Sequence, residues 1–204
     1  MSTIKKTVKK VKIVRKKIPI EKEISTQYYL AIDVGKINLG YAIYNGENIG
    51  FNVLNVEKQI IEKTKNEFGE KTSKIEVLNK WVNHLCKQYN FSKVYIEQQV
   101  INNVSAMVIQ SILETLFYIK GIPCCEFPAA NKFKYLNPQY DTKKKEHKKI
   151  SIEYAKNILK HHDIELDDFE KFPKKDDISD AICMAFMTFR EDRNEMSLIK
   201  EYLQ

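Results

Sequence analysis

Residues 28–56 contain three short apolar runs joined by two tight turns, and no other feature of the sequence limits the fold so strongly. The first two runs, 28–34 and 39–44, flank a turn that carries a glycine. The segment "NGEN" (45–48) then leads into a third run at 49–56. Asn-Gly between apolar runs is a strong short-range signal of a β-hairpin. We therefore predict a meander of three antiparallel strands.

Asp33 lies at the end of the first of these strands, where an unpaired carboxylate next to apolar neighbours is costly. Two structural explanations are available, a turn cap or an ion pair with a nearby lysine. Two functional explanations also apply, a metal ligand or part of a phosphate-binding hairpin. The other acidic residues of the chain are needed to choose between them.

The chain after the meander alternates between helical and extended patterns. The predicted elements are a helix at 72–88, a strand at 93–99, a helix at 102–121, a strand at 122–127, and helices at 148–160 and 176–191. This order predicts the α/β class, with a mixed sheet of three antiparallel strands and then parallel strands, flanked by helices. A length of 204 residues suits one folded domain. We assign it to 27–204 and interpret 1–26 as a flexible basic arm.

Charge is distributed unevenly along the sequence. Residues 1–24 carry nine Lys or Arg and two Glu, a net charge of +7 that equals the formal charge of the whole chain. Residues 131–160 hold nine Lys against three acids, whereas residues 163–180 hold eight acids against three Lys. A basic segment beside an acidic cluster suits a metal-dependent enzyme that acts on a polyanion. A solvated charged loop would explain the same pattern.

The sequence favours an intracellular protein that has no membrane role. No apolar run reaches the roughly 18 residues that a membrane span needs, and the N-terminus lacks the apolar region of a secretory signal. The four cysteines follow neither a metal-ligand nor a disulfide spacing, which favours a reducing compartment. If the protein is viral, we expect the host-cell cytoplasm. A mitochondrial presequence is less favoured, because the arm is rich in Lys rather than in Arg and Ser.

Carboxylates stand at the ends of three predicted elements. Asp33 ends the first strand, Glu97 ends the fourth, and Asp177 and Asp180 lie three apart at the start of the last helix. Ligands of α/β folds gather at the carboxyl ends of strands, and clustered carboxylates repel one another unless a cation relieves the repulsion. Mg²⁺ prefers such oxygen ligands. Two ions about 4 Å apart can activate a water and stabilise a leaving oxygen. Helix capping alone would also explain an acid at a helix start.

The segments "AIDVGKINLGYAI", "VYIEQQ" and "DDISDAICMAF" together resemble the ribonuclease H-like Holliday-junction resolvases, the bacterial RuvC group and its poxvirus relatives. The resemblance covers residues 28 to about 190 and holds in order as well as in residue type. It implies a ribonuclease H-like fold and an active site that binds two Mg²⁺ or Mn²⁺ ions. The residues implied as catalytic metal ligands are Asp33, Glu97, Asp177 and Asp180. Asp176 replaces Asp177 if the helix register differs by one residue.

The same resemblance implies a catalytic lysine ahead of the last helix. Five lysines lie in that segment, and the spacing from the following helix favours Lys148. Lys132, Lys145 and Lys149 are the candidates for contacts with nucleic acid.

The implied function is an endodeoxyribonuclease that resolves four-way DNA junctions by paired symmetric nicks, in recombination or viral DNA processing. The implied partners are junction DNA and a second copy of the chain, with no small-molecule substrate. The apolar helix 102–120 is the best candidate for the dimer surface, although core packing would explain it equally well.

Three other functions remain open. An ordinary ribonuclease H that cleaves RNA–DNA hybrids and a catalytically silent nucleic-acid-binding module would both use this fold. An ATPase of the actin and hexokinase type also has a strand-Asp-Gly-strand hairpin. That architecture needs two such domains and a second glycine-rich loop, whereas this chain has six glycines and room for one domain.

Overall fold

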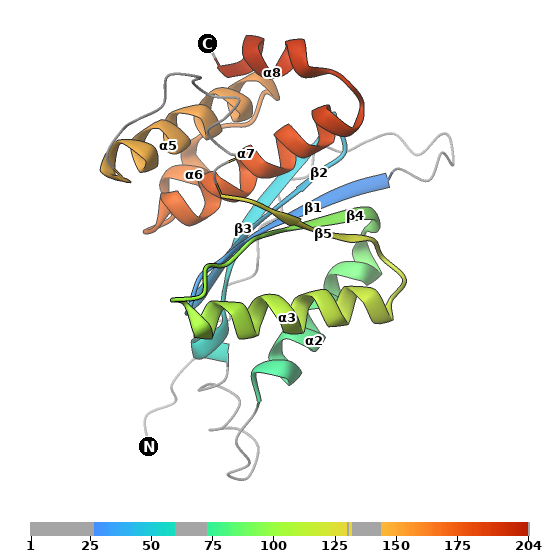
Figure 1. Cartoon of the computed structure of the whole chain (residues 1–204). Coiled ribbons are helices and arrows are strands. Elements are labelled where there is room, and N and C mark those ends of the chain that lie inside the picture. The colour runs from blue at the N-terminus through green and yellow to red at the C-terminus, as the bar shows by residue number, and fades with distance from the viewer. Residues whose placement is uncertain (1–26, 60–72, 130, 132–143, 204) are drawn as a thin grey trace, which may run out of the picture.

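A five-stranded mixed sheet with helices on both faces forms the body of the computed structural model, which describes residues 27–59, 73–129, 131 and 144–203 (Figure 1). The strand order is β3-β2-β1-β4-β5. β1 is antiparallel to β2, β2 is antiparallel to β3, and the pairs β1–β4 and β4–β5 are parallel. The strands are β1 (Gln27–Val34), β2 (Asn38–Tyr44), β3 (Ile49–Asn55), β4 (Asn90–Glu97) and β5 (Cys124–Phe127).

The predicted three-stranded meander is present, and the "NGEN" turn closes its second hairpin. The Asn45 side-chain oxygen accepts hydrogen bonds from the backbone N–H groups of Glu47 (3.0 Å) and Asn48 (2.7 Å). Gly46 takes a φ of 96°, which only glycine adopts easily. β4 begins three residues earlier than predicted and ends at Glu97, because its first half pairs with the start of β1.

One face of the sheet is covered by α2 (Lys74–Gln88) and α3 (Val104–Ile119) (Figure 1). The Ser73 hydroxyl caps the start of α2 by accepting the Glu76 N–H at 3.2 Å. Alternate residues of β1, Leu30 and Ile32, pack into the core on this face together with the apolar stripes of both helices.

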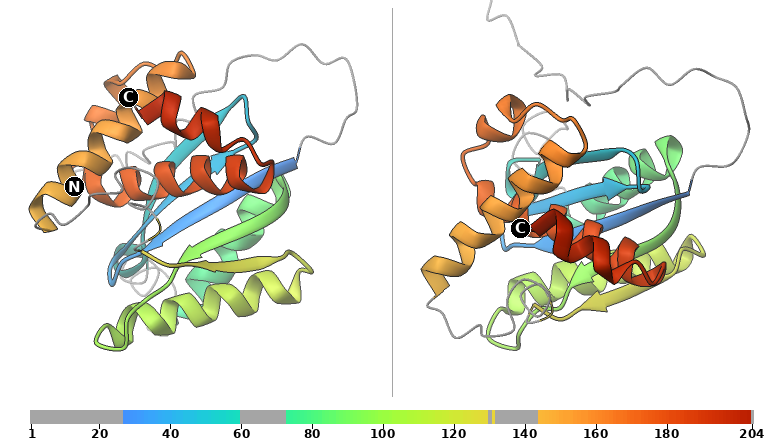
Figure 2. Two further views of the ribbon diagram at one scale, coloured as in Figure 1. Left: turned by 45° about the horizontal axis from the view of Figure 1, so that its top comes forward. Right: turned by 90° about the horizontal axis from the view of Figure 1, so that it is seen from above.

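The opposite face is covered by α7 (Lys175–Asp192), which lies over β1 and β2 (Figure 1). Seen from above in Figure 2, α5 (Lys144–His161) and α8 (Met196–Leu203) lie over α7 in turn. α7 therefore lies between two layers, and every residue from Ile178 to Phe189 except Asp180 is buried. Its predicted core stripe is correct, but the opposite side is also covered.

Two details of this layer differ from the sequence prediction. α5 begins at Lys144, four residues before the predicted start, because the lysine-rich segment ahead of it has no apolar period to reveal a helix. The short helices α6 (Asp167–Glu170) and α8 were not predicted. α6 contributes the fully buried Phe169 to the core on the α7 side of the sheet.

The last residue of α7, Asp192, anchors that end of the helix to the sheet. Its carboxylate accepts hydrogen bonds from the hydroxyls of Tyr29 (2.9 Å) and Tyr95 (3.0 Å), and it forms an ion pair with Lys93 (2.9 Å). Burial alone would raise the pKa of Asp192, but these three donors lower it below its ordinary value. Because Tyr29 lies on β1 and Lys93 and Tyr95 lie on β4, the C-terminal end of α7 is fixed to both central strands.

Several further predictions concern parts of the molecule away from the sheet. The basic arm (1–26) and Lys132 lie outside the described residues. Within the described part of the chain, no helix is long and apolar enough to cross a membrane. All four cysteines are free thiols.

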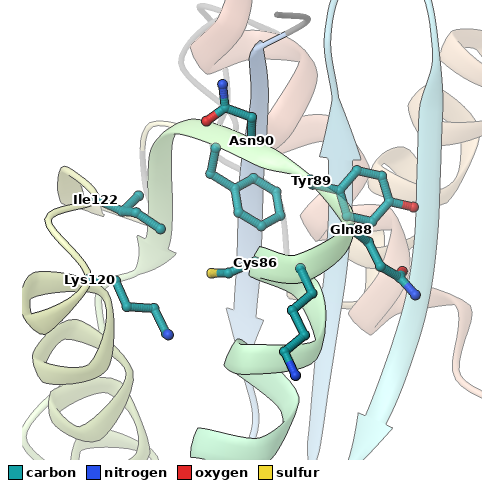
Figure 3. Close-up of a pocket in the computed structure, with 8 residues that line it drawn as sticks. Cys86, Gln88, Tyr89, Asn90, Lys120 and Ile122 are labelled. Atoms are coloured by element: carbon teal, nitrogen blue, oxygen red, sulfur yellow. The ribbon is translucent and has the colours of Figure 1, made fainter.

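The pocket in Figure 3 lies where α2 and α3 end and β4 begins, and Cys86, Asn90, Lys120 and Ile122 are among its lining residues. Asn90, the first residue of β4, lies about 23 Å along the strand from Glu97, the last. The pocket contributes no residue to the acidic group described next.

Candidate active site at the ends of β1 and β4

The carboxyl ends of β1 and β4 place Asp33 and Glu97 side by side. The two strands are parallel neighbours, and Ile32 pairs with Ile96 immediately before the two acids. Side chains alternate between the faces of a sheet, so Asp33 points to the same side as Ala31. Ala31 belongs to the core beneath α7, as does Tyr95, two residues before Glu97. Both acids therefore face the layer that contains α7.

Gly40 allows the first turn of α7 to approach this part of the sheet. It pairs with Asp33 across the β1–β2 ladder. A Cβ atom at Gly40 would lie 2.0 Å from the Asp177 carbonyl oxygen and 3.2 Å from the Ile178 nitrogen. The backbone of α7 thus rests directly on β2, and no side chain larger than hydrogen fits between them.

This close approach brings Asp180 to the two strand-end acids. Asp33, Glu97 and Asp180 each have a carboxylate oxygen within 4.8 Å of the others, and we call these three residues the carboxylate cluster. All three are half-buried. Three carboxylates this close repel one another, and a divalent cation relieves that repulsion. The chemistry of the donor set, three hard oxygen ligands from three different elements, fits Mg²⁺ or Mn²⁺.

Ser151 of α5 holds the α7 member of the cluster. Its hydroxyl donates a hydrogen bond to the Asp180 carboxylate, and only 2% of Ser151 is exposed. Such a donor fixes the rotamer of a ligand and leaves its other oxygen for a metal. Sequence reasoning did not identify Ser151 or the contact at Gly40. The available signals were a serine between two isoleucines in the predicted helix and the second glycine of the first hairpin.

The two acids that begin α7 have different surroundings. Burial alone would raise the pKa of Asp176, but its ion pair with Lys148 lowers that pKa. Burial, and next the repulsion from Asp176, raises the pKa of Asp177. Asp177 is not a member of the carboxylate cluster, although the sequence predicted it beside Asp180. Asp177 and Asp180 lie three residues apart and share a side of α7, but Asp177 is about 4.5 Å nearer to the start of the helix along its axis.

Lys148 is close to the acids of α7. Its hydrogen bond and ion pair with Asp176 raise its pKa, and the charges of Asp177 and Asp180 act in the same direction. Lys148 and Ser151 lie three residues apart on α5, so they share the face that meets α7. Lys149 is exposed on the same helix. The backbone of Lys145 is part of α5, but its side chain is outside the described structure.

Solved structures with the same fold include two of RuvC from Thermus thermophilus. The structure of T. thermophilus RuvC in complex with a Holliday junction substrate matches with a TM-score of 0.57 and 12% identity, over 83% of this chain and 97% of that chain. A second RuvC structure from this organism matches with a TM-score of 0.51 and 14% identity, over 83% and 98% of the two chains. The strand order and these two matches show an α/β fold of the ribonuclease H-like class, and the carboxylate cluster lies at the ends of its strands.

Sequence comparison then places the chain within that class. The sequence model of the poxvirus A22 protein family matches residues 28–191, and the chain belongs to this family. A relative, "Uncharacterized protein 97L" of Invertebrate iridescent virus 3, is 32% identical over 93 residues. That match covers 44% of this chain and 43% of the length of protein 97L.

Proposed function

We propose that the protein is a divalent-metal-dependent endonuclease that resolves four-way DNA junctions. The observation that carries this proposal is the carboxylate cluster, which stands at the strand ends of the fold that RuvC shares. That RuvC was solved in complex with a Holliday junction substrate supports the same substrate here. Membership of the poxvirus A22 family supports a role in viral DNA processing inside the host cell.

Asp33, Glu97 and Asp180 are the residues that we propose as ligands of the first cation. Asp177 is the acid that we propose for a second ion, since it lies one turn of α7 before Asp180. Bound cations would acidify a water and neutralise charge on the scissile phosphate. Other residues of the protein hold and orient these carboxylates. Ser151 keeps the Asp180 carboxylate in place, and α7 shields one side of the cluster from solvent.

Lys148 is the residue that we propose to stabilise charge on the phosphate. Its side chain is 66% exposed, so its ammonium can leave Asp176 and bind a DNA phosphate. The Asp176 side chain is itself 25% exposed, so its carboxylate keeps contact with water when Lys148 leaves. Lys149 and Lys145 on α5, together with Lys132 and the basic arm, are proposed as phosphate contacts that supply affinity rather than chemistry.

The outer face of α3 is proposed as the surface that pairs two copies of the chain. One side of α3 packs in the core, and the other exposes large apolar side chains that a monomer rarely leaves in water. The exposed apolar residues of α3 and of the segment before it are Val100, Ile101, Val104, Val108, Tyr118 and Ile119. A two-fold pair would present two carboxylate clusters, as two symmetric nicks require.

Val108→Glu should convert the dimer into a monomer at micromolar concentration and abolish paired cutting, because it places a charge in the centre of this apolar face. Ile75→Glu on α2 is the matched control, since Ile75 is also an exposed apolar residue, 58% accessible, but lies on another helix. Sedimentation velocity measures the assembly state. A Val108→Glu protein that remains dimeric would place the interface elsewhere.

A gel assay tests the whole proposal. We expect the protein with Mg²⁺ to cut a synthetic four-way junction in two opposing strands and to yield nicked duplexes that a ligase seals. Without the metal, or with plain duplex DNA, cutting should be far slower. Preferred cleavage of an RNA–DNA hybrid would indicate an ordinary ribonuclease H. Metal-independent binding without cleavage would indicate a catalytically silent nucleic-acid-binding module. ATP hydrolysis would indicate an ATPase of the actin and hexokinase type.

A further inference from the structure

Gln110 is a buried polar residue in the middle of α3, on the side that packs against the sheet. Only 6% of it is exposed, and its neighbours along this face of α3 include Ala106 and Leu113. Burying an amide costs free energy unless all its polar atoms are bonded. The Gln110 amide makes three hydrogen bonds. Two of them link α3 to the segment that follows β4 and to β5, and the third, to Glu114, lies within α3.

The oxygen of this amide holds the chain just after Glu97. Gln110 Oε1 accepts a hydrogen bond from the backbone N–H of Gln99 at 2.9 Å. The Gln99 side chain donates in turn to the Glu97 carbonyl at 3.2 Å. The parallel ladder between β4 and β1 ends at Ile96, one residue earlier. Beyond that point the backbone around Glu97 is held by β5 on one side and by this link to α3.

Two carboxylates fix which way the Gln110 amide points. Its Nε2 group donates to Glu114 at 2.7 Å and to Glu126 at 2.9 Å. The second oxygen of Glu126 accepts from the Gln98 side chain at 3.2 Å, so β5 is tied to the same segment. Because both acids need the NH₂ group, only the amide oxygen is available to Gln99. A flipped amide would set its oxygen against two carboxylate acceptors and its NH₂ group against the Gln99 N–H. A glutamate at position 110 would place a third negative charge beside Glu114 and Glu126.

We propose that Gln110 is a positioning residue for the metal ligand Glu97, acting through Gln99. This inference rests on the proposed metal-dependent function and adds a residue outside the carboxylate cluster on which metal affinity depends. Residues outside the ligand set that orient a metal ligand typically alter metal affinity by about tenfold or more when they are replaced. A purely structural role for Gln110 would lower stability and leave the metal affinity unchanged.

The test is Mn²⁺ titration calorimetry on the full-length protein without DNA, with thermal unfolding recorded for each variant. Gln110→Met keeps the length of the side chain and removes its hydrogen bonds, so we expect metal binding to weaken about tenfold. Leu113→Ala is the control, since it creates a cavity in the same face of α3 without touching the link. It should lower the unfolding temperature and leave the Mn²⁺ affinity unchanged.

A charge-conserving exchange provides a second, independent comparison. Gln110→Glu alone places a third carboxylate beside Glu114 and Glu126 and should weaken Mn²⁺ binding at least as much as Gln110→Met. Adding Glu126→Gln supplies a new donor to the residue at 110 and restores the original net charge. The double variant should recover most of the lost affinity. This pair of variants decides the question even if Gln110→Met fails to fold.

The outcomes separate the inference from the function on which it rests. Absence of Mn²⁺ binding by the wild-type protein would overturn the proposed metal centre itself. Wild-type binding with unchanged affinity in Gln110→Met or Gln110→Glu would overturn the positioning role alone. The same holds if Leu113→Ala weakens Mn²⁺ binding as much as Gln110→Met, or if the double variant binds no better than Gln110→Glu.

Discussion

Asp180→Asn should lower the rate of junction cleavage by about a thousandfold, while the affinity for the junction stays close to that of the wild type. Asp180 is the α7 member of the carboxylate cluster, and the neutral amide removes one of the three charged oxygens that we propose as ligands. Loss of charge stabilisation in the transition state by this factor corresponds to about 4 kcal/mol. Binding survives because phosphate contacts from lysines, which supply most of the affinity for DNA, are untouched.

Single-turnover cleavage and a gel-shift assay in Ca²⁺ measure the two quantities separately. Asp167→Asn is the control, because it makes the same chemical change at an exposed position on α6 that is not a member of the cluster. The unfolding temperature supplies a further readout, since Mn²⁺ should stabilise the wild type by mass action and Asp180→Asn much less. An Asp180→Asn protein that cuts at a rate near that of the wild type would remove Asp180 from the proposed ligands.

Gly40→Ala should damage stability and activity together. The added Cβ would sit 2.0 Å from the Asp177 carbonyl oxygen, so the first turn of α7 has to move away from β2. Overpacking at a contact this tight costs about 3 kcal/mol, which lowers the unfolding temperature by about 6–12 °C in a chain of this size. A shift of about 1 Å in a catalytic side chain can cost about a hundredfold in rate, and Asp180 lies on the helix that moves.

Gly50→Ala is the matched control for this experiment. Gly50 lies on the neighbouring strand β3, and an added Cβ there would meet nothing within 4 Å. Thermal unfolding and the junction assay on both variants should separate the close contact from any general effect of replacing a strand glycine. Equal behaviour of the two variants would show that α7 adapts without loss at Gly40.

The central part of the fold could be predicted because local signals and burial agree there. Alternating and apolar runs separated by an Asn-Gly turn identified β1, β2 and β3, and the helical periods identified α2, α3 and α7. The start of α5 and the helices α6 and α8 were missed. Their sequences are short or lysine-rich, so local pattern does not identify them. Packing against α7 stabilises α5 and α8, and α6 buries Phe169 in the same core.

The grouping of the three clustered acids could also be predicted in part, because each lies at or near the end of an element that the local pattern identifies. Asp33 and Glu97 follow from strand ends in a parallel pair, and Asp180 from the start of a helix that packs over them. The pairing of Lys148 with Asp176 and the bond from Ser151 to Asp180 depend on how α5 lies against α7. No spacing within one segment determines that contact, so sequence alone left the choice between Asp176 and Asp177 open.

Because Asp192 is anchored to the sheet, the number of residues in α7 between Asp180 and Asp192 determines where Asp180 lies and which way it points. Asp192 is bound to Tyr29, Lys93 and Tyr95, and it comes twelve positions after Asp180. Each residue of an α-helix adds about 1.5 Å and about 100° of rotation. One residue gained or lost inside this interval would turn Asp180 away from the two strands while Asp192 stayed in place. The part of α7 from Asp180 to Asp192 can therefore vary by substitution but not in length, if both the cluster and the anchor are to be kept.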